Sequence, residues 1–146
     1  MSFKIFVLED DMNRIMSFKS RFQEWGHFDV SYAKNITEAK EKWRREVGHG
    51  WDFVFLDHDL GGRQMVRTNE ENTGSGFVRW LLNDPYYPIP KCATWIIHSF
   101  NPVGAANMYN MLVNAGVYAK QIPSVWEKSV FEKKFNNSLC RDHRRM

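Results

Sequence analysis

The sequence predicts a single α/β domain built on a parallel sheet. Short apolar runs of the buried-strand type alternate along the chain with segments of helical periodicity. That alternation is typical of a parallel sheet covered by helices on both faces. The chain has 146 residues, 43% hydrophobic and 25% charged, which is ordinary for one folded domain with a sizeable core. We therefore expect one domain over residues 1–146, with five parallel strands in three layers.

The N-terminal part of the chain shows the alternation clearly. Residues 12–25 have apolar side chains at near-helical spacing, with Asp11 as the expected N-cap and Gly26 as the stop. We expect Thr37 to cap the second helix. The predicted elements are a strand at 4–8, a helix at 12–25, a strand at 28–33, a helix at 35–47 and a strand at 52–56.

The C-terminal part continues the pattern after a long polar segment. Residues 61–76 are punctuated by glycine and are long for a connection between a strand and a helix, which indicates a functional or a mobile loop. Pro102 is typical of a helix start, and Gly116 of a helix end. The predicted elements are a helix at 77–82, a strand at 94–97, a helix at 103–115, a strand at 117–122 and a helix at 129–139.

Composition limits which cellular compartment and which binding partners we expect for this protein. The net charge of +3 is weakly basic and does not by itself indicate nucleic acid, and we expect no recognition of DNA sequence. The aromatic content of 15% is high, and a packed core explains it better than base-stacking platforms. Cys92 and Cys140 lack the spacing of a metal site, so we expect free thiols. The N-terminal apolar run is too short for a signal peptide or a membrane span, which predicts a cytoplasmic protein.

Polar side chains collect where predicted strands end. Ligands of parallel sheets bind at the carboxyl ends of the strands, and right-handed crossovers place all of these ends at one edge. We therefore expect a functional site there. The groups that follow the first, third and fourth strands are Glu9-Asp10, Asp57-His58-Asp59, and His98-Ser99 with Asn101.

The acids at this edge predict a metal site. Glu9, Asp10 and Asp57 offer the oxygen ligands that Mg²⁺ or another divalent cation takes in proteins. Such an ion stabilises charge on phosphoryl oxygens or lowers the pKa of a bound water. Asp57 could serve as a metal ligand or as a nucleophile. Acids at the end of a strand can also be purely structural, as a helix cap for example.

The two histidines predict acid–base chemistry. Opening a cyclic phosphodiester needs a base that activates water and an acid that protonates the leaving oxygen. Imidazoles titrate near neutral pH, so His58 and His98 could divide these tasks. Asp59 would orient one imidazole or join the metal site. A lone histidine is more often structural, but two at the ends of neighbouring strands favour function.

Four further residues are candidates for binding phosphate. Ser99 and Asn101 offer a hydroxyl and an amide beside His98, and Lys120 offers a charge. Asn101 followed by proline is also typical of a helix start, and a helix N-terminus itself attracts phosphate. Thr73 lies in the long polar loop, which could bind phosphate or ribose or could equally be a solvated loop.

The chain resembles the receiver domains of two-component response regulators. The resemblance covers most of its length and implies a flavodoxin-like three-layer sandwich. It also implies that Asp57 accepts a phosphoryl group next to Mg²⁺, held by the acids. The matching positions are the acidic pair Glu9-Asp10, Asp57, the hydroxyl of Ser99 and the lysine Lys120.

A closer resemblance is to a variant group, the cyclic-phosphate-processing receiver-like domains. The matching segments are residues 56–61 (LDHDLG), 73–80 (TGSGFVRW) and 97–108 (IHSFNPVGAANM). The chain departs from ordinary receivers in having the bulky Phe100 where they have a small residue, and Gln121 in place of a proline after Lys120. The variant group implies the processing of cyclic phosphates such as 2′,3′-cyclic RNA ends.

These observations predict a metal-assisted phosphoesterase that acts on an RNA end or a cyclic nucleotide. An alternative is a signalling receiver that is phosphorylated on Asp57 and binds a protein partner. A third interpretation is a degenerate receiver that only binds protein and has no affinity for metal. The first requires turnover, the second requires phosphoryl uptake on Asp57, and the third tolerates the loss of both histidines in everything but stability.

Overall fold

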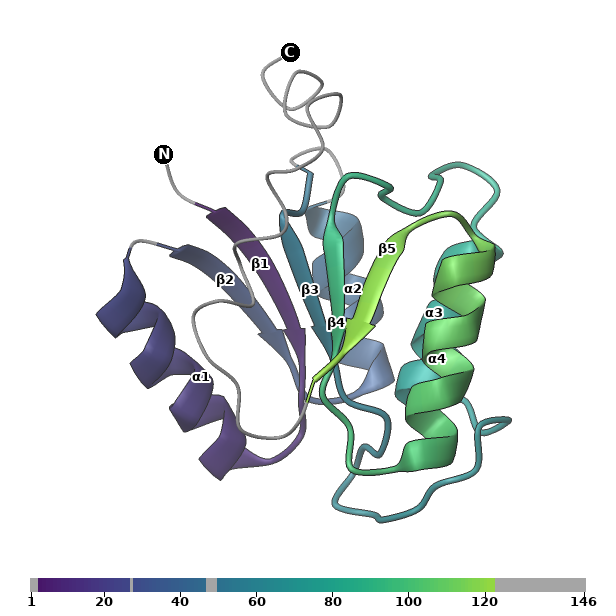
Figure 1. Cartoon of the computed structure of the whole chain (residues 1–146), viewed down its shortest axis with the longest axis horizontal. Coiled ribbons are helices and arrows are strands. Elements are labelled where there is room, and N and C mark those ends of the chain that lie inside the picture. Colours follow the sequence, from purple (N-terminus) through teal and green to yellow (C-terminus); the bar gives the residue numbers. More distant parts are fainter. Residues whose placement is uncertain (1–2, 27, 47–49, 123–146) are drawn as a thin grey trace.

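The computed structural model describes residues 3–26, 28–46 and 50–122. Within these ranges strands and helices alternate as the sequence predicts (Figure 1). The predicted helix at 129–139 lies outside the described residues. The elements are β1 (Phe3–Leu8), α1 (Met12–Trp25), β2 (Phe28–Ala33), α2 (Ile36–Arg45), β3 (Phe53–Leu56), α3 (Gly74–Leu82), β4 (Thr94–Ile97), α4 (Pro102–Asn114) and β5 (Tyr118–Gln121).

The five strands form one parallel sheet in the order β2-β1-β3-β4-β5, which confirms the predicted sheet. Leu8 at the end of β1 is in register with Leu56 at the end of β3, and Leu56 with Ile97 at the end of β4. These three strands therefore end at the same level. The residues that follow them are brought together at one edge of the sheet.

The sheet lies between two layers of helix. Helix α1 covers one face, and α2, α3 and α4 cover the other, as Figure 1 shows. Alternation along β1 explains the division: Ile5 and Val7 pack on the α1 side with Phe18 and Phe22, whereas Phe6 and Leu8 join the core under the other helices.

Aromatic side chains fill the larger core. The Phe6 ring lies 5.1 Å from Trp43, 5.2 Å from Trp51 and 5.5 Å from Phe77, measured between ring centroids. All four residues are buried. Rings in edge-on and stacked contact add to the free energy gained from burying their area. These aromatics therefore pack the core, which is the role that the high aromatic content predicts.

Capping residues set where the helices begin. The Asn35 side chain accepts a hydrogen bond from the Glu38 amide, so Asn35 caps α2 and the prediction of Thr37 is wrong. Helix α3 begins at Gly74, earlier than predicted, because the Thr73 hydroxyl accepts from the Gly76 amide at 2.9 Å. Asn101 caps α4, which begins at Pro102 as predicted.

Two other expectations concern the cysteines and the membrane. Cys92 is disulfide-bonded, so the expectation of a free thiol is wrong for this residue, and Cys140 lies outside the described residues. In the described part of the chain, no helix combines the length and apolar character needed to cross a membrane.

Candidate functional site

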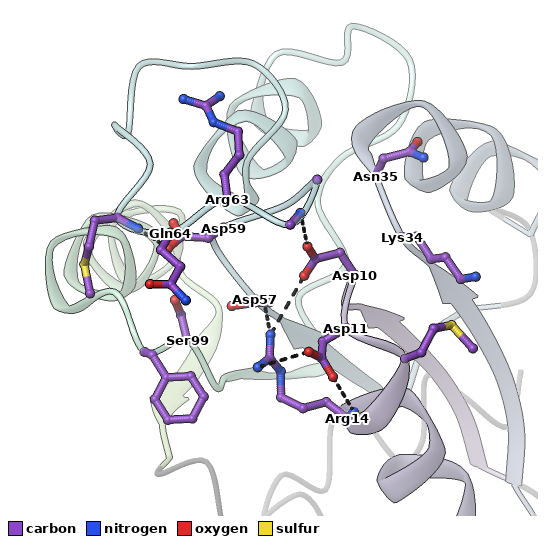
Figure 2. Close-up of a pocket in the computed structure, with 15 residues that line it drawn as sticks. Asp10, Asp11, Arg14, Lys34, Asn35, Asp57, Asp59, Arg63, Gln64 and Ser99 are labelled. Atoms are coloured by element: carbon purple, nitrogen blue, oxygen red, sulfur yellow. Dashed lines mark hydrogen bonds and ion pairs between the residues drawn. The ribbon is translucent and has the colours of Figure 1, made fainter.

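A cavity of about 790 Å³ opens at the carboxyl ends of the strands (Figure 2). Four segments line it: the β1–α1 turn with the first turn of α1, the β2–α2 turn, the segment after β3, and the β4–α4 turn. The lining residues are 10–12, 14, 34, 35, 57, 59, 61–65, 99 and 100. The cavity therefore occupies the edge where the sequence predicts a site.

Three carboxylates converge here: Asp10 and Asp57 line the cavity, and Glu9, which does not line it, is fully buried next to them. One oxygen from each of Glu9, Asp10 and Asp57 lies within 4.8 Å of the others. Backbone hydrogen bonds hold this geometry, because Glu9 donates its amide to the Ala33 carbonyl and Asp57 donates to the Leu8 carbonyl. The structure thus brings together the three residues predicted as metal ligands, and Glu9 and Asp57 are buried.

Arg14 is the cation of this acidic cluster. Its Nε lies 2.7 Å from Glu9 Oε1, and one terminal nitrogen lies 2.9 Å from Glu9 Oε2 and 3.4 Å from Asp57 Oδ2. Figure 2 shows Asp10, Asp57 and Arg14 turned toward one another. The motifs of the sequence do not include Arg14. Its place one turn after the acidic pair, at the start of a predicted helix, is the signal that could have identified it.

The carboxylates of the cluster have displaced pKa values. Burial, together with the nearby charge of Glu9, raises the pKa of Asp57 to about 8. Burial opposes ionisation of Glu9 as well, but hydrogen bonds with His98 and Arg14 bring the pKa of Glu9 well below its usual range. Burial also raises the pKa of Asp10, although the Gly62 amide donates to its carboxylate. One arginine therefore does not stabilise the ionised form of all three acids.

His98 lies beneath the cluster on the α1 face of the sheet. Its Nε2 is 3.2 Å from Glu9 Oε1, and its ring centroid is 5.2 Å from that of Phe18 and 6.3 Å from that of Phe55. Its Nδ1 is buried and has no hydrogen-bond partner among the described residues. Since Glu9 is ionised, the proton that joins the pair is assigned to Nε2. His98 therefore acts on Glu9 and does not line the cavity.

His58 is buried on the opposite face of the sheet. Its Nδ1 lies 2.9 Å from Asp59 Oδ1, and its Nε2 lies 3.0 Å from the hydroxyl of Ser75 in α3. Both ring nitrogens thus have partners. The structure does not bring His58 and His98 together, because one contacts α3 and α4 while the other contacts α1.

Asp59 and Asn101 join the segment after β3 to the β4–α4 turn. Asp59 accepts hydrogen bonds from the amides of Met65 at 2.6 Å and Val66 at 3.1 Å. The Asn101 side chain donates to Asp59 at 3.0 Å and to the Val66 carbonyl at 3.1 Å. Burial works against the ionised Asp59, but these bonds and the one with His58 lower the pKa of Asp59. We call this group, Asp59, Asn101, Met65 and Val66, the clasp.

The remaining phosphate candidates are placed differently from one another. Ser99 lines the cavity together with Asp57, and its hydroxyl accepts from the Asn101 amide at 3.0 Å. Thr73 is fully buried, and its hydroxyl caps α3 and donates to the Glu70 carbonyl. Lys120 is on β5 in register with Ile96 and is not among the residues that line the cavity. Ser99 alone of these candidates faces the site.

Two glycines allow the helices to approach the strand ends. A Cβ on Gly104 would overlap the His58 ring, and a Cβ on Gly74 would overlap the Asp57 carbonyl. The Gly74 amide donates to the His58 carbonyl at 2.9 Å. The glycines of the second and third motif segments therefore let α3 and α4 pack directly on Asp57 and His58.

Comparisons with known proteins agree with this architecture. The family model described as "Cyclic-phosphate processing Receiver domain" matches residues 5–114. The chain belongs to this family. The match covers the acidic cluster and the clasp of this receiver domain and ends before Lys120. No curated protein matches the sequence.

Solved structures of receiver domains share the fold. A response regulator receiver domain protein (CheY-like) from Methanospirillum hungatei is 15% identical, with a TM-score of 0.64 and full coverage of both chains. One from Clostridium thermocellum is 16% identical, with a TM-score of 0.65 and 99% coverage of both chains. The phosphorylated cyanobacterial phytochrome response regulator RcpA is 17% identical, with a TM-score of 0.61 and coverage of 91% of this chain and 88% of that one. At these identities the likeness establishes the receiver fold alone.

Proposed function

We propose that this receiver domain is a divalent-metal-dependent phosphoesterase that opens a cyclic phosphate on an RNA end or a nucleotide. The observation that carries the proposal is the convergence of Glu9, Asp10 and Asp57, of which Asp10 and Asp57 line an open cavity. The family's description, which names cyclic phosphate, supports the substrate class.

The three carboxylates fit a divalent cation. Their donor atoms are all oxygens, as Mg²⁺ prefers, and the buried Asp57 has a raised pKa that a second positive charge would lower. When bound by Glu9, Asp10 and Asp57, the ion would supply charge stabilisation at the phosphoryl oxygens and a water of lowered pKa. His98 holds Glu9 in place, and the Gly62 amide holds Asp10.

Two side chains are placed to bind the phosphate itself. The Arg14 guanidinium reaches the cavity, and its donors can form the paired hydrogen bonds that phosphate oxygens accept. The Ser99 hydroxyl faces the same cavity and can donate to another oxygen. We propose that Arg14 exchanges contacts with Glu9 and Asp57 for contacts with the substrate.

We propose that the histidines act as positioning residues. His98 is fixed against Glu9, and His58 fixes Asp59, so each imidazole acts through a carboxylate. Both rings are buried, and neither lines the cavity. That they exchange protons with substrate stays a prediction from the sequence, which a test on His98 distinguishes from positioning.

Turnover of an RNA oligonucleotide that ends in a 2′,3′-cyclic phosphate tests the proposal. The full chain should open the ring in Mg²⁺ and not in EDTA, and Asp57→Asn should lose turnover. Asp29→Asn is the matched control, because Asp29 is an exposed acid on β2 remote from the cavity. Turnover in EDTA, or turnover retained by Asp57→Asn, would contradict the proposal.

A second function is favoured by one observation. Asp57 at the end of β3 and Ser99 after β4 face the same cavity, which is the arrangement that the resemblance to response regulators implies for phosphoryl uptake. Acetyl phosphate with Mg²⁺ would then add one phosphoryl group to the intact protein, and Asp57→Asn would not take it up. Stable uptake without turnover would establish a signalling receiver, for which a protein partner is the expected reader.

A further inference from the structure

Three large apolar side chains lie exposed at the rim of the cavity, alongside polar ones such as Lys34, Arg63 and Gln64. Met12, Met65 and Phe100 all line the cavity, with exposed fractions of 50%, 63% and 60%. Large apolar side chains in open contact with water give up the free energy of burial, and grouped ones are typical of ligand-binding grooves. A site for phosphate and metal alone does not need them. The rim therefore indicates a ligand with an apolar part.

Met65 is held in a conformation that L-residues disfavour. Its φ is +50°, and it is the one non-glycine residue in the described ranges with a positive φ. The clasp enforces this conformation, because the Met65 amide donates to Asp59 Oδ2 at 2.6 Å. Backbone strain that the surroundings impose is typical of ligand clamps. The conformation keeps a flexible, polarizable side chain exposed at the cavity.

The same clasp connects the backbone next to Phe100 with the backbone next to Met65. Phe100 directly precedes Asn101, Met65 directly precedes Val66, and the Asn101 side chain donates to the Val66 carbonyl at 3.1 Å. The guanidinium carbon of Arg14 lies 5.6 Å from the centroid of the Phe100 ring. Arg14 therefore contacts both the Phe100 ring and the carboxylates of Glu9 and Asp57.

We propose that Phe100 and Met65 bind the nucleobase of the substrate, so that the base contributes to affinity in addition to the cyclic phosphate. The inference rests on the proposed function and assigns the part of its site that binds the base. The volume of about 790 Å³ lies within the range of about 300–1,000 Å³ that holds a molecule larger than a phosphate group. Aromatic side chains stack with any base because every base has a π-face. The phosphate would bind at the acidic cluster and the base at the rim.

Binding of two matched ligands tests this inference. The probes are adenosine 2′,3′-cyclic monophosphate and methyl riboside 2,3-cyclic phosphate, which keeps the sugar and the cyclic phosphate but lacks the base. Calorimetry on the full chain, at low temperature with Ca²⁺ in place of Mg²⁺, gives both dissociation constants. We expect the adenosine ligand to bind about 5- to 150-fold more tightly, the range that stacking of one base provides.

Variants of the rim locate the preference. Phe100→Leu, which keeps an apolar side chain without the ring, should lose most of the preference for adenosine, and Phe100→Trp should keep it. Tyr86→Leu is the matched control, because Tyr86 is 83% exposed and does not line the cavity. Equal affinity for the two ligands, no binding of the adenosine ligand, or an unchanged preference in Phe100→Leu would overturn the inference. Base-dependent binding without turnover in Mg²⁺ would support it and reject the phosphoesterase.

Discussion

Arg14 and His98 act on one carboxylate from different sides. Arg14 donates two hydrogen bonds to Glu9 from the cavity, whereas His98 donates one from the core. A fully buried carboxylate needs such partners to remain ionised. Only Arg14 can be replaced by a cation that enters through the cavity, because the His98 ring is enclosed by Phe18 and Phe55. We therefore expect the histidine contact to persist when a cation binds.

Replacing His98 distinguishes positioning from direct proton exchange. His98→Gln retains an N–H donor for Glu9, so Mg²⁺ affinity and most of the turnover should persist with an unchanged pH–rate profile. His98→Leu removes the donor and should weaken Mg²⁺ binding by about 10- to 100-fold, as loss of a residue that orients a ligand usually does. Calorimetric titration with Mg²⁺ and turnover across pH check both variants. An equal loss of turnover in the two variants, with Mg²⁺ affinity intact, would instead make His98 an acid or base.

At the scale of elements, the site depends on how closely α3 and α4 approach the strand ends. Each helix begins with a cap and a glycine: Thr73 and Gly74 in α3, Asn101 and Gly104 in α4. The caps satisfy the first amides, and the glycines remove the side chains that would keep the helices away. His58 can then hydrogen-bond to Ser75 while Asp59 holds the clasp.

Gly104→Ala tests this close approach by the sign of its effect. In an exposed helix, alanine in place of glycine stabilises by about 1 kcal/mol. Here the added methyl would overlap the His58 ring, so the variant should lose about 1–3 kcal/mol of unfolding free energy, as overpacked cores do. Urea unfolding measures the change. Gly116→Ala is the comparison, since its position has open space and only the cost of a positive φ. A stabilised Gly104→Ala would contradict the packing.

The order of elements and the acidic cluster were predictable from the sequence. The period of apolar residues determines the strands and helices, and parallel topology brings the ends of β1, β3 and β4 together, so Glu9 and Asp57 could be placed beforehand. The cap of α2 was not predictable, because Asn35 and Thr37 are both residue types that commonly cap helices.

The direction of side chains was beyond what sequence patterns give. Consecutive residues past a strand end need not follow its alternation, so the sequence did not show that His58 and His98 point to opposite faces. The role of Thr73 could not be predicted either, because the same hydroxyl can bind phosphate in an open loop or cap a helix. Since α3 begins directly after it, Thr73 is the cap. The role of Arg14 was not predictable either, because it depends on a long side chain that folds back over the acids.

For the molecule as a whole, the buried acids connect the site to stability. The chain has a net charge of +3, yet two buried acids, Glu9 and Asp57, lie at the carboxyl ends of its strands. A folded state that keeps Asp57 protonated binds a proton that the unfolded state releases. Folding is therefore coupled to pH, and a divalent cation that binds the ionised carboxylate would change this coupling.

The metal-free protein should lose stability as the pH rises toward 8. The pKa of Asp57 is raised from 3.8 to about 8 by burial and by the charge of Glu9. Between these values the unfolded state binds fewer protons than the folded state, so the unfolding free energy falls with rising pH, by at most about 1.4 kcal/mol per pH unit. The fall ends above the pKa of the folded state.

Urea unfolding of the full chain in EDTA, from pH 5.5 to 8.5, measures this fall against Asp57→Asn, whose amide does not titrate. The variant should gain stability relative to the wild type as the pH rises, and Asp29→Asn should follow the wild type. Mg²⁺ should remove the slope from the wild type, because a cation on the carboxylates favours their ionised form. Parallel profiles for the wild type and Asp57→Asn in EDTA would show that Asp57 is already ionised in the folded protein, and would contradict this coupling.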